Sequence, residues 1–385
     1  NKDYYFSTEK HCMQIYLVGG AIRDRLLGLP APYEQDWVVV GSSPEEMESK
    51  GFIKVGKSFP VFIDPRTTEE YALARTESKS GHGYHGFDFN IGPDITLEDD
   101  LMRRDLTINA IAEDDKGNLI DPFNGTEDLE NRVLRHVSNA FRDDPLRVLR
   151  VARFMSKLSS FGFNIADETL TLIKEIVTSG ELDYLVPERI WIETEKALNN
   201  ESFGIYFKTL SKFDAVNHIY PDLTGIDQIF PNYPFEAYSE ASIEMKMASL
   251  FCALDSVHEK DLIDELDDIQ NRIKFPNSLK SFTKMALHTS KIIGGSENKI
   301  SPSDVYKFLE ATDAYRNPEK LWMTIEFHNC TNDPDLRAKT QLISDAFEAS
   351  KNIVYDEVVF QGLEGDAIKA KLGALRIKEI NLILK

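Results

Sequence analysis

Two acidic residues, Glu34 and Asp36, stand two positions apart at the start of an apolar run, Trp37–Val40. On an extended chain, residues i and i+2 project to the same side, so both carboxylates face one way at the edge of a strand. A glycine pair, Gly19-Gly20, ends an earlier apolar run and precedes a segment with helical spacing. Carboxylate oxygens suit Mg²⁺, and the free amides of a helix N-terminus suit phosphate. The stretch therefore predicts a divalent metal held against a triphosphate.

Taken alone, the two acids are more typical of a turn that follows a proline. The glycine pair is also neither the dinucleotide fingerprint nor a P-loop. Two neighbours favour the metal interpretation: Arg23 follows the glycine turn, and Glu70 offers a third carboxylate on a predicted strand. Because metal-assisted reactions of a triphosphate use ions held by carboxylates in fixed positions, we expect Glu34, Asp36 and Glu70 to be catalytic.

A second group of residues recurs at intervals of three in FRDDPLRVLRVARF, namely Asp144, Arg147, Arg150 and Arg153. On a helix these lie close to one face. A single Asp–Arg pair would be an ordinary solvated ion pair, but three arginines repel one another unless an anion or a base lies between them. A carboxylate accepts and a guanidinium donates, so an Asp144–Arg147 pair matches the amine and ring nitrogen of cytosine or adenine. Uracil or guanine would leave groups unpaired, at about 1–3 kcal/mol each.

These motifs together resemble the polymerase-β-type nucleotidyltransferases, specifically the class II enzymes that add CCA to tRNA 3′ ends and their poly(A) polymerase relatives. The resemblance implies that Glu34 and Asp36 bind metal and that Gly20 and Arg23 cradle the triphosphate. Arg103-Arg104-Asp105 resembles the family motif that contacts the sugar of the nucleotide. The implied nucleotide pocket comprises Gly20, Arg23, Arg104, Asp144, Arg147, Arg150 and Arg153.

Further segments extend the resemblance to about Leu198. Asp121–Asp128 resembles the family's flexible hinge, and Pro187-Glu188-Arg189 with Glu193 resembles a helix-stabilising motif, which we interpret as structural. The chain departs from the family pattern at Glu34, where the family carries aspartate, and at Asp143, where it carries glutamate. The glutamate side chain is one methylene longer than aspartate, and Mg²⁺ tolerates little departure from octahedral geometry. The backbone must therefore shift to accommodate the extra length, or the rate of the reaction is lower.

The pattern of apolar runs predicts an α+β protein. An N-terminal α/β head of the polymerase-β type, residues 1–137, precedes an all-helical neck (138–205), body (206–335) and tail (336–385). The predicted strands are Ile15–Val18, Trp37–Val40, Val61–Ile63, Tyr71–Ala74 and Leu119–Ile120. We also expect a mobile loop over 76–93 and a helix over 101–112. The basic residues predicted to help the tail bind tRNA are Lys369, Lys371, Arg376, Lys378 and Lys385.

Composition limits the alternatives. The chain has 385 residues, 42% of them hydrophobic, and a formal charge of −20, which argues against general nucleic-acid binding. Its three cysteines form no C-x-x-C unit. No apolar run has the roughly 18 residues of a membrane helix, so we expect no membrane partner and a cytoplasmic location. Residues 1–12 precede Met13 and are interpreted as an extension outside the fold.

We therefore predict template-independent addition of CCA to tRNA from CTP and ATP with Mg²⁺, by a monomer or homodimer. One alternative is a poly(A) polymerase or an enzyme that adds only C or only A. An alternative of another class is a degenerate relative that binds tRNA without turnover. Some relatives carry a phosphohydrolase domain marked by adjacent His-Asp. Here Leu254 precedes Asp255 and His258 is not followed by Asp, so we expect no phosphohydrolase activity.

Overall fold

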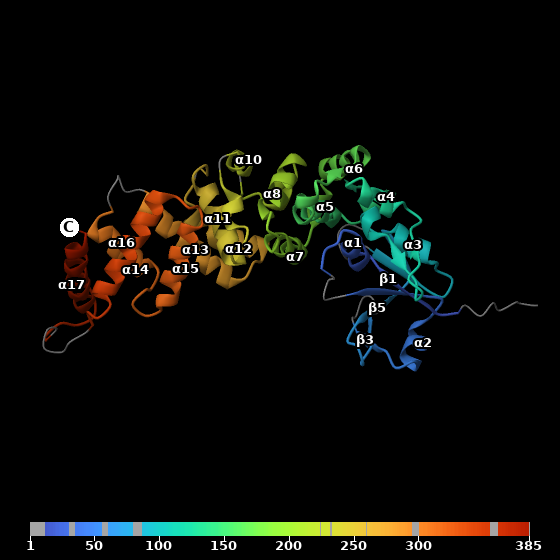
Figure 1. Cartoon of the computed structure of the whole chain (residues 1–385), viewed down its shortest axis with the longest axis horizontal. Helices are drawn as coiled ribbons and strands as arrows, with labels where there is room; N and C mark the ends of the chain where they lie inside the picture. Colours follow the sequence, from blue (N-terminus) through green and yellow to red (C-terminus); the bar gives the residue numbers. More distant parts are fainter. Residues whose placement is uncertain are drawn as a thin grey trace, which may run out of the picture. The chain divides into compact units, whose positions relative to one another are not determined.

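The computed structural model describes residues 12–30, 35–55, 61–79, 87–223, 225–231, 233–258, 260–294, 300–354 and 361–384. The chain divides into two compact units. The first runs to Ile190 and includes Lys212–Ile219, and the second comprises Trp191–Ser211 and Tyr220–Lys385. In the described residues, the strands lie in the blue-to-green part of the chain, and the yellow-to-red part is helical (Figure 1). The predicted α+β class is confirmed, whereas the predicted boundaries of head, neck, body and tail stay predictions.

The first unit contains a seven-stranded sheet of order β3-β4-β5-β2-β1-β8-β9. Its strands are β1 (Gln14–Val18), β2 (Asp36–Val40), β3 (Ile53–Val55), β4 (Val61–Ile63), β5 (Glu70–Leu73), β8 (Ala112–Glu113) and β9 (Leu119–Ile120). β2 pairs antiparallel with β1 and parallel with β5. The predicted strands are therefore confirmed, with ends shifted by a residue, and β3 and β8 are added.

The sheet is buried on both faces, which explains why β1 and β2 read as apolar runs. Val18 and Val38 pack on one face with Ala74, Leu101 and Ala110. The other face has a second core cluster, formed by Val39, Met47, Phe62, Tyr71 and Leu73. Because side chains alternate along a strand, Asp36 shares the face of Val38.

The helices of the first unit are α1 (Gly20–Leu26), α2 (Pro44–Ser49), α3 (Leu97–Met102), α4 (Gly125–Glu130), α5 (Leu146–Lys157) and α6 (Asp167–Thr178). A short parallel pair of strands, β10 (Val133–Leu134) and β11 (Asn164–Ile165), also belongs to this unit. The amphipathic pattern of α5 buries its apolar face, including Val148, Leu149 and Val151. The predicted helix with arginines at intervals of three is confirmed.

The predicted helix over 101–112 is wrong beyond Met102, where α3 ends. The Asp105 carboxylate accepts from the backbone N–H of Leu106 at 2.8 Å, and Leu106 is extended, with φ −125° and ψ 147°. A side chain that bonds to the nearby backbone competes with the helix. A short 3-10 helix, η2 (Thr107–Asn109), follows. Arg103, Arg104 and Asp105 therefore lie in a turn rather than on a helix surface.

The predicted loop over 76–93 is also wrong in part. Two strands, β6 (Arg75–Lys79) and β7 (Phe87–Ile91), form an antiparallel pair with Arg75 opposite Ile91. Residues 80–86 lie outside the described residues. The alternation of Phe87, Phe89 and Ile91 is typical of a strand and was the missed signal.

The second unit is built from helices that pack around their own core. Its helices include α8 (Phe203–Lys212), α10 (Ile226–Ile229), α11 (Ile243–Asp255), α12 (Leu262–Ile273), α13 (Asn277–Gly294), α14 (Pro302–Ala311), α15 (Pro318–Asn329), α16 (Pro334–Ser350) and α17 (Asp366–Ile383). Two further helices, α7 (Pro187–Leu198) and α9 (Val216–Ile219), lie where the chain passes between the units. A core cluster around Phe308, Ile343 and Phe347 buries α14 and α16 together. Among the described residues, no helix combines the length and apolar content needed to cross a bilayer.

Candidate nucleotidyl-transfer site

Two carboxylates meet at one edge of the sheet. Asp36 is the first residue of β2 and Glu70 the first of β5, and the two are paired across the parallel strands. On its other side Asp36 is paired with Val18, the last residue of β1. Paired residues on neighbouring strands are about 5 Å apart and project to the same face. Asp36 and Glu70 are both exposed, so they form an accessible acidic pair beside the end of β1.

The donor chemistry of this pair fits a hard divalent cation. Carboxylate oxygens suit Mg²⁺, which keeps several ligands from water or substrate phosphate. Glu34, the other predicted metal ligand, lies outside the described residues. Within the described part of the chain, no three His, Cys, Asp or Glu side chains form a metal-binding group. Asp36 and Glu70 thus offer two protein oxygens and leave the remaining positions to other donors.

The glycine turn lies directly after β1, at the same edge. Gly19 has φ 74° and ψ −123°, a backbone conformation that favours glycine. A Cβ at this position would lie 3.2 Å from Arg104 Nη1 and 3.5 Å from the Asn109 carbonyl oxygen. The Gly19 N–H donates to the Ile111 carbonyl at 3.1 Å. The lack of a side chain therefore lets Arg104 lie against the turn that opens α1 at Gly20.

A buried carboxylate holds Arg104 in this position. Asp100 is fully buried and accepts from Arg103 at 2.7 Å and from Arg104 at 3.2 Å. Burial raises the pKa of Asp100, but the two guanidinium groups lower it, and the pKa lies below its ordinary value. The ionised carboxylate ties both arginines to the end of α3. The structure thus brings Arg104 to the glycine turn and the acidic pair to the same sheet edge.

Arg23 has a different environment from the one expected. It is 4% exposed, and its Nε donates to Asp24 at 2.8 Å while Nη1 donates to the Asn109 side chain. Its Cζ lies 4.9 Å from the centre of the Phe154 ring. Burial lowers the pKa of Arg23, and Asp24 opposes that shift. Arg23 therefore joins α1 to α5, and its predicted contact with a triphosphate would require these bonds to open.

The arginines of α5 lie next to this link. Arg150 donates from Nε to Asp105 at 2.6 Å, and Arg153 Cζ lies 4.4 Å from the Phe154 ring centre. Burial raises the pKa of Asp105, but Arg150 and Asn109 lower it, and the pKa lies well below its ordinary value. Asp105 is therefore an anion that holds α5 against the turn after α3.

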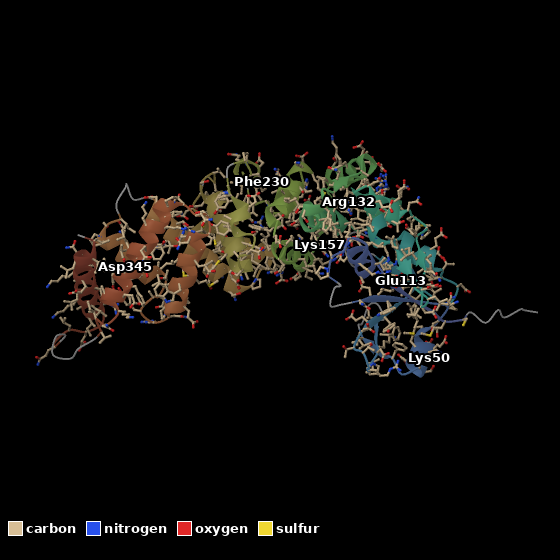
Figure 2. All side chains as sticks on the ribbon, in the orientation of Figure 1. Lys50, Glu113, Arg132, Lys157, Phe230 and Asp345 are labelled. Carbon is tan, nitrogen blue, oxygen red and sulfur yellow. The ribbon has the colours of Figure 1, made fainter. Side chains whose placement is uncertain are left out.

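A lysine completes the same network. Lys157, labelled in Figure 2, donates from Nζ to Asp24 at 2.8 Å. Burial lowers the pKa of Lys157, and Arg23 lowers it further. The predicted pocket residues Arg23, Arg150 and Arg153 thus lie in one block around Phe154.

Asp144 and Arg147, which are predicted to read the base together, have separate partners in this structure, and their role in base selection stays a prediction. Arg189 donates to both oxygens of Asp144, from Nη1 at 3.2 Å and from Nη2 at 2.8 Å. Arg147 is 7% exposed and donates to two backbone carbonyls, at Ala140 (2.6 Å) and Arg103. Asp144 precedes α5 with an extended backbone, so it does not share the helical face of Arg147.

Arg189 is the residue that sequence reasoning missed. It was interpreted as part of a helix-stabilising motif, and it does lie in the first turn of α7. Bidentate Arg–carboxylate pairs fix orientation as well as charge. No local signal connects Arg189 with Asp144, which is 45 residues earlier in the chain. Only the fold joins them.

The predicted hinge motif is tightly bonded. Asp121 accepts from the backbone N–H of Gly125 at 2.7 Å and of Thr126 at 2.8 Å. A Cβ at Gly125 would lie 2.2 Å from the Thr107 carbonyl oxygen, so α4 rests directly on η2. This segment is fixed to its neighbours in the first unit. Its predicted motion between two nucleotides stays a prediction.

Two predicted features lie in the second unit. In the region that lacks the adjacent His-Asp of the phosphohydrolase relatives, His258 Nε2 contacts Glu265 at 2.9 Å, and Asp255 forms an ion pair with Lys291 at 3.3 Å. In the predicted basic patch, Arg376 donates from Nη2 to the Ile353 carbonyl at 3.1 Å, and its Cζ lies 3.5 Å from the Tyr315 ring centre. Arg376 therefore packs inward, whereas Lys369, Lys371 and Lys378 of α17 are exposed and Lys385 lies outside the described residues.

Two family models match the chain. The poly(A) polymerase head domain matches residues 15–135, and a domain described as the probable RNA and SrmB-binding site of polymerase A matches residues 162–226. The first match includes the acidic pair and the glycine turn. The second lies after the arginine helix and includes Arg189.

Solved structures resemble the chain over nearly its whole length. A Bacillus stearothermophilus CCA-adding enzyme in complex with CTP shares 25% identity at a TM-score of 0.70, with 97% of this chain and 90% of that chain covered. A CCA-adding enzyme in an apo form has 22% identity, a TM-score of 0.71, and coverage of 96% and 88%. A Thermotoga maritima CCA-adding enzyme complexed with tRNA has 21% identity, a TM-score of 0.65, and coverage of 97% and 91%.

Proposed function

We propose that the chain, as a member of the class II tRNA nucleotidyltransferase and poly(A) polymerase family, adds C, C and A to the 3′ end of tRNA from CTP and ATP. Nucleotidyl transfer is the activity that its family and structural neighbours support. The observation that carries the proposal is the meeting of Asp36, Glu70 and the Gly19 turn at one edge of the sheet.

In this proposal the sheet edge is the reaction centre. Asp36 and Glu34 hold divalent metal, with Glu70 as the neighbouring carboxylate. When bound, Mg²⁺ neutralises triphosphate charge and makes the attacking 3′-hydroxyl more acidic. The backbone N–H of Gly20, at the start of α1, and the guanidinium of Arg104 provide donors for the phosphates and sugar. The fully buried Asp100 keeps Arg104 at that place.

Selection of the base is assigned to the start of α5. Asp144 accepts from the exocyclic amine of cytosine or adenine, and Arg189 fixes the orientation of its carboxylate. Arg147 donates to the adjacent ring nitrogen after giving up one of its two carbonyl partners. UTP and GTP leave groups unpaired, at about 1–3 kcal/mol each, which corresponds to rejection of tenfold to a hundredfold. Arg150 and Arg153 hold the block on which this pocket rests.

The tRNA is assigned to the helical part of the chain. Exposed lysines on α17, Lys369, Lys371 and Lys378, offer cations on an otherwise acidic chain. Phosphate contacts of this kind position a nucleic acid without reading its sequence. A cytoplasmic location, the oligomeric state and the absence of phosphohydrolase activity stay predictions. Turnover of a 2′,3′-cyclic nucleotide with Ni²⁺ or Mn²⁺ would contradict the last of these.

One incorporation assay tests the proposal. A tRNA that ends at its discriminator base is incubated with each nucleoside triphosphate alone and with CTP and ATP together, with Mg²⁺ or with EDTA. We expect CTP to add two residues, the mixture to stop after CCA, and EDTA to prevent both. Long A-tails would identify a poly(A) polymerase, and addition of only C or only A would identify a partial enzyme.

A second arm of the assay tests the degenerate alternative. If the native chain adds no nucleotide and Glu34→Asp restores addition, the native chain is a tRNA-binding relative without turnover. If the native chain is active and Glu34→Asp leaves its rate unchanged, glutamate serves as well as aspartate at this position.

A further inference from the structure

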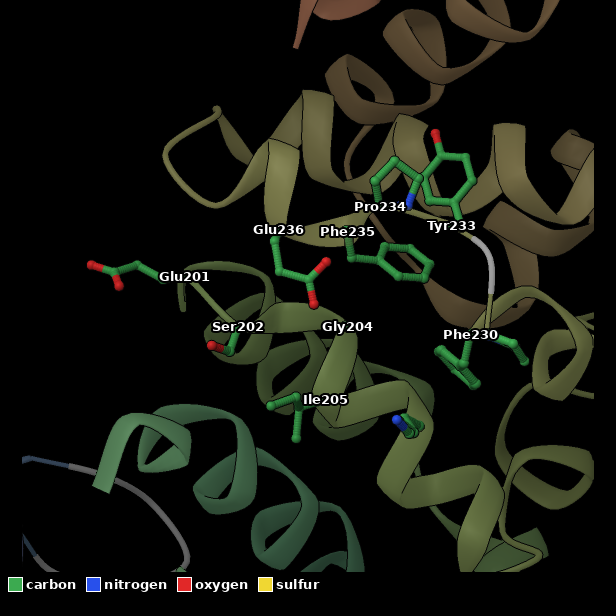
Figure 3. Close-up of a pocket in the computed structure, with 11 residues that line it drawn as sticks. Glu201, Ser202, Gly204, Ile205, Phe230, Tyr233, Pro234, Phe235 and Glu236 are labelled. Atoms are coloured by element: carbon green, nitrogen blue, oxygen red, sulfur yellow. The ribbon is translucent and has the colours of Figure 1, made fainter. Parts of the chain in front are cut away.

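Asn109, a residue without a role in the proposed reaction, lies where charged side chains of the first unit converge. Functional sites use a few polar groups that converge on one place. In the pocket of about 450 Å³ that Figure 3 shows in the second unit, Glu201 instead extends away from Phe235 and Glu236. Around Asn109, a guanidinium and a carboxylate meet at one amide.

The Asn109 amide joins two groups of opposite charge. Its Oδ1 accepts from Arg23 Nη1, and its Nδ2 donates to Asp105 Oδ1 at 3.0 Å. All three residues are buried, with Asn109 6% exposed, Arg23 4% and Asp105 5%. An amide suits this position because one end accepts and the other donates, whereas a carboxylate only accepts and an ammonium only donates.

The nitrogens of the Arg23 guanidinium have partners of different strength. Nε and Nη2 lie 2.8 and 2.7 Å from Asp24 Oδ1, whereas Nη1 donates to the neutral amide of Asn109. A bond from a guanidinium to a carboxylate is stronger than one to an amide, because both partners are charged. Nη1 is therefore the donor that Arg23 gives up most easily.

The Arg23 guanidinium lies next to the glycine turn. A Cβ on Gly20 would be 3.4 Å from Arg23 Nη2, and Gly20 is the first residue of α1. The main chain of Asn109 reaches the same turn, since its carbonyl oxygen lies 3.5 Å from Arg104 Nη1 and 3.5 Å from the Cβ position of Gly19. A phosphate at this turn is therefore close enough to Arg23 for Nη1 to exchange the amide for a phosphate oxygen.

We propose that Asn109 is a positioning residue whose neutral amide holds Arg23 Nη1 in the free enzyme and releases it to a phosphate oxygen of the bound nucleotide. This role rests on the proposed function, in which the triphosphate lies at the glycine turn. Asp105 keeps its bond from Arg150 at 2.6 Å when Arg23 is released, so the contact with α5 persists. A carboxylate in place of the amide would bind Nη1 too firmly and would repel Asp105.

The test compares Asn109→Asp with Asn109→Leu in the full chain. Both new side chains are close to asparagine in shape, but one is charged and the other neither accepts nor donates. Equilibrium dialysis without tRNA gives the dissociation constant of CTP with Mg²⁺. Addition of one C to tRNA that ends at the discriminator base gives kcat and KM.

We expect Asn109→Asp to raise the dissociation constant and KM of CTP about tenfold or more, with kcat within about threefold of the native value. Asn109→Leu should raise them about threefold or less, because Nη1 then has no bond to give up. A purely structural amide predicts the opposite order, since aspartate keeps one of the two bonds and leucine keeps neither. Asn109→Ala, which adds no bulk, should give the same result as Asn109→Leu.

Asn118 provides the matched control. It is exposed between β8 and β9, and its Nδ2 donates to Asp114 Oδ2 at 2.8 Å, so Asn118→Asp also places a carboxylate beside an aspartate. We expect Asn118→Asp to change the affinity for CTP by less than about twofold. In an Arg23→Met background, Asn109→Asp and Asn109→Leu should differ by less than about twofold, because Nη1 is gone. Far-ultraviolet circular dichroism and urea unfolding check the fold of each variant.

Three results would overturn the role of Asn109. The first is CTP binding by Asn109→Asp that is as tight as that of Asn109→Leu and Asn109→Ala. The second is a loss confined to kcat, and the third is a difference between Asn109→Asp and Asn109→Leu that persists without Arg23. If the native chain binds CTP but adds nothing to tRNA, the proposed function fails, while the order of CTP affinities still tests the role of Asn109.

Discussion

The substitution Arg189→Met tests the base-selection geometry. It removes the guanidinium that donates to both oxygens of Asp144, at 2.8 and 3.2 Å, and keeps an unbranched apolar stem in its place. Asp144 then retains the backbone N–H of Leu146 at 3.2 Å. The carboxylate stays next to the start of α5 but is free to turn. We therefore expect Arg189→Met to impair the reading of the base rather than the transfer step.

The size of the effect follows from the exposure of the pair. Hydrogen bonds to charged groups contribute about 1.5–3 kcal/mol. The two side chains are 24% and 20% exposed, so solvent screening reduces this to about 1–2 kcal/mol. That corresponds to a fivefold to thirtyfold loss in kcat/KM for CTP, since about 1.4 kcal/mol is tenfold. The loss should appear in KM and in the preference for CTP over UTP.

The assay is steady-state addition of one nucleotide to tRNA that ends at the discriminator base, with CTP and with UTP. Arg142→Met is the matched control, because it breaks the Arg142–Glu175 pair, whose side chains are 50% and 48% exposed. We expect the control to change kcat/KM by no more than about twofold. Equal effects of the two variants, or a lower kcat with an unchanged CTP preference, would refute the role given to Arg189.

Three further predictions follow from other parts of the chain. Asp36→Asn should lower kcat by roughly a thousandfold, since the stabilisation of charge by a bound metal is worth several kcal/mol. The affinity for tRNA, measured by filter retention, should stay within about twofold. Equal losses of kcat and tRNA affinity would contradict the role of Asp36 as a metal ligand. Gly19→Ala should lower the free energy of unfolding in urea by about 1–3 kcal/mol. Gly28→Ala should lower it by less. Both glycines have positive φ, but a Cβ at Gly19 would meet Arg104, whereas no atom lies within 4 Å of the Cβ position of Gly28. Burial lowers the pKa of His328 to about 3. As the pH falls, the unfolded state, in which this pKa is near 6.5, therefore binds the proton before the folded state does. Between pH 7.5 and 5 the free energy of unfolding should fall by about 2 kcal/mol more in the native chain than in His328→Gln. Equal pH dependence of urea unfolding in the two proteins would contradict the burial argument.

Features encoded locally were predicted well from the sequence. The apolar runs of β1 and β2, the break at Gly19 and the i+3 spacing of the α5 arginines each depend on a few neighbouring residues. The position of Glu70 beside Asp36 could not be predicted from the alternation of side chains alone. Alternation predicts which face of β5 carries Glu70, but not which strand lies next to β5. The parallel register of β2 and β5 provides that neighbour.

Features that depend on distant partners were not predicted. Asp144 was expected on one helical face with Arg147, but its backbone is extended and its carboxylate accepts from Arg189, 45 residues later. Arg23 was expected at the triphosphate, yet burial against Phe154 decides its contacts. Helix α3 ends at Met102, earlier than predicted, because the Asp105 carboxylate accepts from the backbone N–H of Leu106 and from Arg150. In each case a tertiary contact outweighs the local pattern.

The most direct test of the account is a crystal structure of the chain with CTP and Mg²⁺. We expect an ion bound by carboxylate oxygens of Asp36 and Glu34, with Glu70 beside it and the triphosphate next to the Gly19-Gly20 turn. A structure in which CTP is bound but Asp36 and Glu34 are turned away from any ion would contradict the assignment of this sheet edge as the reaction centre.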